Sequence, residues 1–207
     1  MREAINEFDW KDGFLFVGNE VVLDFVNTRP IQGGEPMELL KDFGGILRWF
    51  QAAELLRPGE VASLERQWGR TARAQRAAEA IRELREQLRN EVLSWEHGGV
   101  IHESAIDHLN RLLADHPMRT KLKMNASTPL AELWFEVREP EDLFVPLAHS
   151  AAVLFTTVDR KRVRKCARCV LHFRDTSKKG TRRWCSMRLC GNRLKVAAYA
   201  ARQREHK

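Results

Sequence analysis

The sequence predicts an α+β protein, with a mostly helical N-terminal domain that holds a few antiparallel strands and a small C-terminal module. Apolar residues recur at helical steps of three and four through much of residues 1–159. Residues 160–207 instead contain all four cysteines and 17 basic but only two acidic side chains, a net charge of +15. The first 159 residues carry 18 basic and 26 acidic side chains, a net charge of −8. This asymmetry predicts two domains, 1–159 and 160–207, of which only the second meets a polyanion.

The composition excludes several classes of protein. Of the 207 residues, 43% are hydrophobic and 30% are charged, which argues against a disordered chain and for a buried core. Only four cysteines are present, so a disulfide scaffold is excluded as well. No segment approaches the roughly 18–20 apolar residues of a membrane helix. The N-terminus lacks the apolar segment of a signal peptide. We therefore expect a cytoplasmic protein that does not enter a membrane.

The first predicted elements are separated by glycines. Residues 14–28 are rich in β-branched and aromatic side chains and are interrupted by Gly18-Asn19, a turn signal. This pattern predicts either a strand pair or a strand that leads into a helix. Apolar residues at helical spacing then predict a helix over 37–56, which Pro58-Gly59 ends.

The rest of the N-terminal domain alternates between helical and strand patterns. The clearest helix is predicted over 71–96, where one apolar stripe recurs at steps of three and four. A further helix fits residues 101–115. Alternating side chains predict a hairpin formed by 118–125 and 130–137. A last helix is expected to begin at Glu141, because acidic residues are favoured in a first helical turn.

Arginines are frequent between residues 66 and 89 and could suggest a nucleic-acid-binding helix. Glutamates are interleaved with them, however, at distances that allow pairing along a helix. We therefore interpret this segment as a solvated face of internal ion pairs.

Three polar residues, Asp24, Asn27 and Thr28, lie beside a hydrophobic segment and have two interpretations. They could line a pocket for an unknown small-molecule effector, or they could cap the following turn, which is the interpretation we favour. The chain shows no glycine-rich phosphate loop, no nucleophile elbow and no convincing acid–base pair. We therefore expect no enzymatic activity.

The four cysteines have the spacing C-x2-C-x15-C-x4-C, which predicts a zinc site. Two cysteines separated by two residues can turn onto one ion, and a second pair can complete a tetrahedron. Four thiolates leave no open position for water or substrate, so the expected Zn²⁺ is structural. His172 is an alternative ligand, but we interpret it as a strand side chain because four cysteines already complete the coordination of the zinc ion. The predicted ligands are Cys166, Cys169, Cys185 and Cys190.

Between and after the cysteines, the sequence predicts a zinc-ribbon or treble-clef-like module. Residues 170–175 and 181–184 flank a glycine-containing turn and predict a β-hairpin. Residues 190–205 predict a helix. We expect loss of any one cysteine to unfold this module and to leave the N-terminal domain folded, because metal binding supplies the folding energy of such a small segment.

The basic side chains of the module are candidate phosphate contacts, which would give affinity and salt dependence. On the predicted helix, amide, basic and aromatic groups share one face that also suits base contact and stacking. Arg193 and Asn192 have an equally open structural interpretation, bracing the metal loop, and Trp184 is expected to pack inside the module. The candidates are Arg164, Lys165, Arg168, Lys178, Lys179, Arg182, Arg183, Arg188, Asn192, Arg193, Lys195, Tyr199 and Arg202.

Two segments resemble a known family. The sequence Cys190-Gly191-Asn192-Arg193, preceded by Cys166-x2-Cys169 and Arg183-Trp184-Cys185, resembles the CGNR zinc finger. The segment from Val22 to Thr28 is similar to the opening of the ABATE domain that usually precedes this finger. The resemblance implies a bacterial, stress-related transcription regulator whose finger binds nucleic acid.

Three functions remain in competition at this point. The leading hypothesis is a transcription regulator whose module binds DNA, with an N-terminal domain that senses an effector or forms a homodimer. The second assigns RNA to the same module. The third makes the module a protein-interaction site on a small-molecule-binding domain. The net charge of +15 in 48 residues favours nucleic acid over the third hypothesis but does not separate DNA from RNA.

Overall fold

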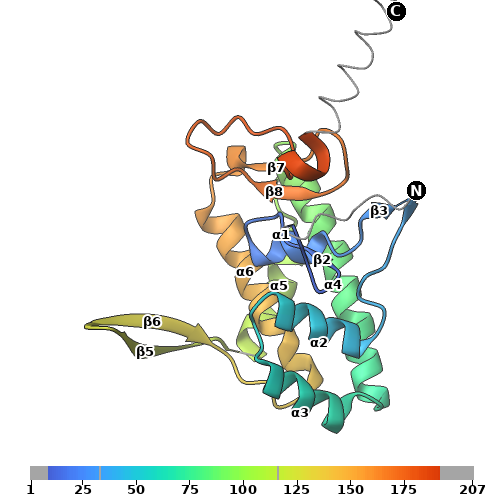
Figure 1. Ribbon diagram of the computed structural model, residues 1–207, viewed down its shortest axis with the longest axis vertical. Coiled ribbons are helices and arrows are strands. Elements are labelled where there is room, and N and C mark those ends of the chain that lie inside the picture. Colours follow the sequence, from blue (N-terminus) through green and yellow to red (C-terminus); the bar gives the residue numbers. More distant parts are fainter. Residues whose placement is uncertain (1–8, 33, 116, 192–207) are drawn as a thin grey trace, which may run out of the picture.

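The computed structural model describes residues 9–32, 34–115 and 117–191, and within these ranges helices alternate with small antiparallel hairpins (Figure 1). The fold is α+β, as predicted. The helices are α1 (Val21–Val26), α2 (Phe43–Ala52), α3 (Pro58–Trp68), α4 (Ala72–Glu96), α5 (Glu103–Asp115) and α6 (Phe144–Thr157). The strand pairs are β1 (Trp10–Lys11) with β2 (Phe14–Leu15), β3 (Ile31–Gln32) with β4 (Glu35–Pro36), β5 (Arg119–Asn125) with β6 (Thr128–Trp134), and β7 (Val163–Lys165) with β8 (His172–Arg174). Shorter turns are η1 (Pro140–Leu143), η2 (Arg160–Arg162) and the π-helical η3 (Met187–Gly191).

The short helix α1 lies at the centre of the N-terminal domain. Five of its six residues are buried, and it packs against α4, α6 and strand β8. Phe25 on this helix contacts Trp49 of α2, with 5.6 Å between the ring centroids. Of the two interpretations of residues 14–28, the strand followed by a helix is therefore the one observed. This position places α1 between the main hydrophobic core and the C-terminal module.

Helix α4 agrees closely with the periodicity of the sequence. The Thr71 hydroxyl caps its first turn by accepting a hydrogen bond from Ala74 N at 3.1 Å. The apolar stripe that includes Ile81, Leu84 and Leu88 is buried, as a one-sided helical pattern requires. This helix spans the domain and ends beside strand β7 (Figure 1).

The predicted helix over 37–56 is shorter than expected. Residues 37–42 are not helical, because Met37 N and Leu39 N donate instead to Pro30 O and Thr28 O. Helix α2 then begins after Asp42, whose carboxylate accepts a hydrogen bond from Gly45 N at 2.7 Å. Pro58, predicted only to end this element, also starts α3, where a proline at the first position loses no helical hydrogen bond.

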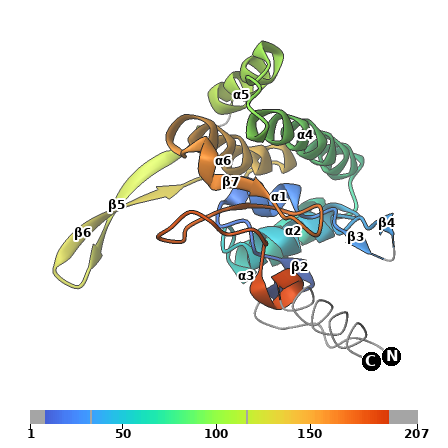
Figure 2. The ribbon, with the colours of Figure 1, turned by 90° about the horizontal axis from the view of Figure 1, so that it is seen from above.

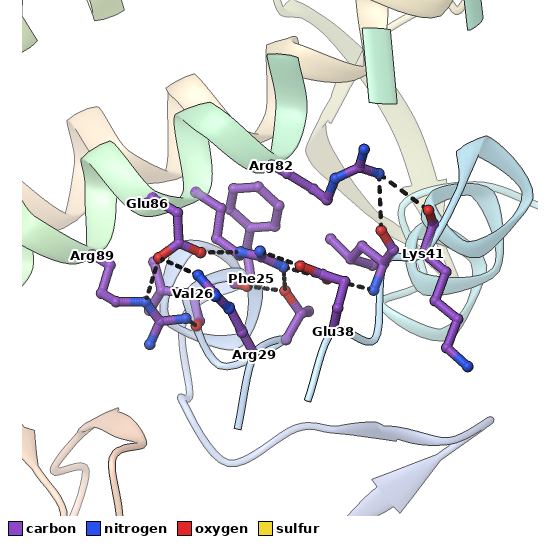
Figure 3. Close-up of polar contacts among 11 residues, drawn as sticks. Phe25, Val26, Arg29, Glu38, Lys41, Arg82, Glu86 and Arg89 are labelled. Carbon is purple, nitrogen blue, oxygen red and sulfur yellow. Dashed lines mark hydrogen bonds and ion pairs between the residues drawn. The ribbon is translucent and has the colours of Figure 1, made fainter. Parts of the chain in front are cut away.

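The predicted solvated face is wrong for Arg82, Arg85 and Arg89, which turn toward the protein. Arg76 is exposed as expected, and Arg85 and Arg89 pair with Glu86 of the same helix. The Arg85 side chain is buried and bonds to both carboxylate oxygens of Glu38 at 2.6 and 2.5 Å. Arg82 donates to Leu40 O, and Arg89 donates to Val26 O (Figure 3). The physical reason is that α4 faces the C-terminal end of α1 and the irregular backbone before α2, whose free carbonyl groups need donors that a long guanidinium can supply.

The predicted β5–β6 hairpin is present and extends away from the helices (Figures 1 and 2). Its second strand is shifted toward the turn, since Thr128 and Pro129, expected between the strands, belong to β6, which ends at Trp134. In its register, Leu122 lies opposite Ala131 and Met124 lies opposite Pro129. Leu122 and Met124 are largely exposed on one face. Within the described ranges, no helix is both long and apolar enough to cross a membrane.

The C-terminal module contains a β-hairpin, but its strands differ from the predicted ones. Strand β8 pairs with β7, which precedes the first cysteine, and residues 181–184 form no strand. Two causes are visible. Asp175 accepts hydrogen bonds from Ser177 N and Arg182 N, which closes residues 175–182 into a loop. The second edge of β8 is occupied by the N-terminal domain, so the expected partner has no free edge to join.

Candidate metal centre and nucleic-acid surface

The four cysteine side chains meet in the C-terminal module, as the spacing predicted. Cys166 and Cys169 lie on the turn between β7 and β8, Cys185 follows the loop, and Cys190 lies on η3. All four sulfurs lie within 4.8 Å of one another and form no disulfide. The Sγ–Sγ distance is 3.6 Å for Cys169–Cys185 and 3.7 Å for Cys185–Cys190. Zinc–sulfur bonds of about 2.3 Å place the corners of a tetrahedron about 3.8 Å apart. The cluster therefore fits one zinc ion.

The ionisation of the thiols also requires a cation. Hydrogen bonds from the neighbouring thiols, Cys169 first, lower the pKa of Cys166. Hydrogen bonding to Cys166 and Cys169, together with burial, raises the pKa of Cys185 well above its usual range. The four groups cannot all become thiolates unless a positive charge compensates them, and Zn²⁺ supplies that charge. Bound zinc joins three segments of the chain, and its closed sulfur shell gives the site a structural role.

Local hydrogen bonds hold the cysteine segments in place. Cys166 N donates to Leu171 O at 2.8 Å, which closes the turn that carries the first two cysteines. The Ser186 hydroxyl accepts from Arg188 N and Leu189 N and thereby caps η3. It also donates to the Asp9 carboxylate at 2.6 Å. The capping role of Ser186 was missed, although a serine before a helical segment is a recognisable signal.

A small hydrophobic cluster surrounds the cysteines and includes residues from the N-terminus of the chain. Leu171 and Phe173 of the module pack in it with Leu15 and Val17. Trp184 packs against the same cluster, as expected. The cluster therefore crosses the boundary expected at residue 159.

His172 is buried on β8 and faces Glu96 of α4. Its Nδ1 lies 3.3 Å from Glu96 Oε2, and Glu96 also accepts a hydrogen bond from Lys165 N. Burial raises the pKa of Glu96, but the neighbouring His172 ring and the hydrogen bond from Lys165 N outweigh burial and lower it. His172 is thus a strand side chain that contacts the N-terminal domain, in agreement with the interpretation from the sequence.

Some basic residues predicted to contact nucleic acid support the module from within. Arg164 donates to Gly180 O at 2.8 Å, and Arg182 donates to Trp184 O at 2.8 Å. The Arg182 guanidinium also lies over the Phe173 ring, 4.7 Å from its centroid. Arg162, which was not among the candidates, donates to Ser177 O at 2.6 Å. These arginines hold the loop of residues 175–182, which we call the finger loop.

Other predicted contacts are exposed to solvent. Lys178 and Lys179 lie on the finger loop, and Arg183 follows it with its guanidinium over the Trp184 ring. Lys165, Arg168 and Arg188 are exposed on the same module. The remaining candidates lie outside the described residues, as does the predicted helix beyond Gly191: Asn192, Arg193, Lys195, Tyr199 and Arg202.

The three polar residues at the end of α1 are buried and hydrogen-bonded within the protein. Asp24 accepts from Gly18 N at 2.7 Å. The Asn27 amide bonds to the backbone of His172. The Thr28 hydroxyl donates to Phe25 O and accepts from Arg85. Burial raises the pKa of Asp24 to about 7, although the hydrogen bonds from Gly18 and Val17 oppose this change.

Comparison with known families is consistent with this geometry. No curated protein matches the chain. The CGNR zinc finger profile matches residues 162–203, which include all four cysteines. The ABATE profile, described as "Putative stress-induced transcription regulator", matches residues 19–158. The chain therefore belongs to the ABATE family and carries a C-terminal CGNR zinc finger.

Proposed function

We propose that the protein is a transcription regulator whose zinc finger binds DNA through the exposed basic residues of the finger loop. The family description supports a regulatory role, including one in a stress response. In this proposal the N-terminal domain binds an effector or forms a homodimer, and the protein catalyses no reaction.

The observation that carries the proposal is the charge of the finger loop. Lys178 and Lys179 of this loop and Arg183, which follows it, are exposed, and no described acidic residue forms an ion pair with any of the three. Arg162 and Arg164 hold the loop backbone from the protein side. Because these bonds restrain the loop backbone, we expect little further conformational freedom to be lost when its lysines contact phosphates, which favours affinity.

The test compares the binding of duplex DNA, single-stranded DNA and structured RNA at several salt concentrations. We expect Lys178→Glu/Lys179→Glu to weaken binding to duplex DNA about tenfold or more. The slope of log K against log salt should fall by about 2, because two phosphate contacts are lost. Fluorescence anisotropy with labelled oligonucleotides measures both quantities.

The matched control is Arg66→Glu/Arg70→Glu, which reverses two exposed charges in the N-terminal domain. It changes the net charge equally and should leave the salt slope unchanged. Equal losses of DNA affinity in the two double variants would show that only the overall charge of the protein matters. That result would contradict the assignment of DNA binding to the finger loop. If RNA binds more tightly than DNA at every salt concentration, the target of the finger is RNA and not DNA. If no nucleic acid binds, the proposal is refuted.

A further inference from the structure

Strand β8 of the zinc finger has two edges with different partners. One edge pairs with β7 in the hairpin. Along the other, His172 N donates to Asn27 Oδ1 and Asn27 Nδ2 donates to His172 O, both at 2.8 Å. Arg174 N donates to Gly18 O at 2.7 Å, and Asn19 Nδ2 donates to Arg174 O at 2.9 Å. The N-terminal domain therefore takes the place of a third strand beside β8.

Asn27 is well suited to this position because a primary amide offers one acceptor and a donor side by side, as the backbone of a strand does. The side chain lies at the end of α1 and is almost completely buried. The two hydrogen bonds with His172 use both the Oδ1 acceptor and the Nδ2 donor of Asn27. If β8 moved away, the Asn27 amide and the buried backbone groups of His172 would lose their partners.

The turn that contacts Arg174 is fixed by α1 as well. The Asp24 carboxylate accepts from Gly18 N at 2.7 Å. A Cβ atom at position 18 would lie 2.7 Å from Asp24 N and 2.8 Å from Leu23 Cβ, so this close approach requires glycine. Two points of contact, Asn27 and Gly18-Asn19, thus join the same helix to the same short strand.

The metal site constrains that strand from its other side. Leu171, the residue before β8, accepts the hydrogen bond of Cys166 N, and Phe173 packs in the cluster with Cys166, Cys185 and Cys190. A pair of three-residue strands is too short to persist without such support. Helix α1 itself packs on α4 and α6, so a change in α1 reaches the core of the N-terminal domain.

We propose that zinc occupancy of the finger is coupled to the order of α1 through β8, and that Asn27 is the positioning residue for this coupling. Zinc holds residues 166–174 in the conformation that satisfies Asn27 and Gly18. Loss of the metal releases β8, leaves the Asn27 amide without partners and loosens α1. The N-terminal domain thereby responds to the metal state of the finger, independently of any nucleic acid.

Thermodynamic linkage provides the first test, because coupling must act in both directions. We expect Asn27→Ala to weaken zinc binding by the full-length chain about ten- to hundredfold, since buried groups of His172 lose their partners. Competition with a chromophoric zinc chelator measures the dissociation constant. Asn125→Ala, the same change at an exposed position of β5, should leave zinc affinity within about twofold of the unmodified chain.

A second control separates coupling from general loss of stability. Leu64→Ala removes a buried side chain of α3, far from the finger contacts, and destabilises the N-terminal domain. At temperatures well below its unfolding midpoint, this variant should bind zinc with the same dissociation constant as the unmodified chain. Weakening by Leu64→Ala equal to that by Asn27→Ala would overturn the assignment to Asn27.

Hydrogen exchange followed by mass spectrometry gives a readout that does not depend on affinity. Chelation of zinc from the unmodified chain should raise exchange in α1 and β2 as well as in residues 160–191. Exchange that rises only in residues 160–191, or an Asn27→Ala variant that binds zinc as tightly as the unmodified chain, would refute the coupling.

Discussion

Among single residues, Asp24 gives the stability of the protein a dependence on pH. Its carboxyl group is buried, which raises its pKa from 3.8 to about 7. The folded protein thus holds this proton over a range in which the unfolded chain has released it. Because the pKa of this carboxyl is higher in the folded than in the unfolded protein, the free energy of unfolding falls as the pH rises. This decrease takes place between about pH 4 and pH 7 and is complete above pH 7.

Replacement of Asp24 by Asn should remove this dependence while retaining an acceptor for Gly18 N. At pH 8 the variant is expected to be more stable than the unmodified chain by up to about 4 kcal/mol, and at pH 4 the two should be similar. Urea unfolding at both pH values, with zinc present in every sample, measures the difference. A stability difference that does not change with pH would contradict the raised pKa of Asp24.

Single residues were predictable where their roles depend on local sequence. The metal ligands follow from cysteine spacing alone, and the confinement of all four cysteines to one segment strengthened that prediction. The role of Asn27 could not be predicted, because its partner His172 lies 145 positions away. The same holds for the hydrogen bond from Arg164 to Gly180 O, because the sequence shows only the charge of Arg164. A sequence shows which side chains are charged, but not which distant residue each of them contacts.

At the scale of elements, periodicity predicted the longest helix and the longest hairpin. Helix α4 follows its 3.6-residue pattern, and the β5–β6 hairpin forms close to the two segments of alternating side chains. The finger hairpin was assigned to the wrong strands because the edge of β8 is occupied by Gly18 and Asn27, which local pattern cannot reveal. Short strands in small modules are determined by such distant contacts more than by propensity.

The buried arginine of α4 gives a prediction at this scale. Arg85→Met should destabilise the protein by about 3 kcal/mol, because Glu38 loses its main partner and Thr28 loses a donor. Burial raises the pKa of Glu38, but the hydrogen bonds and charge of Arg85 outweigh burial and lower it. Chemical denaturation at neutral pH measures the loss, and the double variant Arg85→Met/Glu38→Gln should lose less than the sum of the two single changes.

The exposed Arg66 of α3 serves as the control for this comparison. Its replacement by Met should change the free energy of unfolding by no more than about 0.5 kcal/mol, as is usual for surface positions. Equal effects of Arg85→Met and Arg66→Met would show that the Arg85–Glu38 pair does not connect α4 to the preceding segment.

At the scale of the whole molecule, the charge asymmetry of the sequence and the packing of the structure divide the chain differently. Composition places a boundary near residue 159, and the two family matches also meet there. The hydrophobic cluster around the cysteines nevertheless includes Leu15 and Val17. Glu20 pairs with Arg174 across the same boundary. Charge therefore divides the chain into two parts of opposite sign, whereas packing joins them into one structure.

This arrangement changes the expected outcome of losing a cysteine. Cys185→Ser removes a zinc ligand, and from the sequence alone we expected it to unfold the finger and spare the N-terminal domain. Because β8 completes hydrogen bonds of α1 and the finger covers Leu15 and Val17, we now expect the helical unfolding transition to shift as well. A loss of several kcal/mol lowers the midpoint of a chain of this size by about 10 °C. Circular dichroism at 222 nm during heating measures that midpoint, with Lys123→Ser on the distant β5–β6 hairpin as a control that should not move it.

An unchanged helical midpoint in Cys185→Ser would mean that the N-terminal domain is stable without the finger. The boundary at residue 159 would then mark two parts that fold independently.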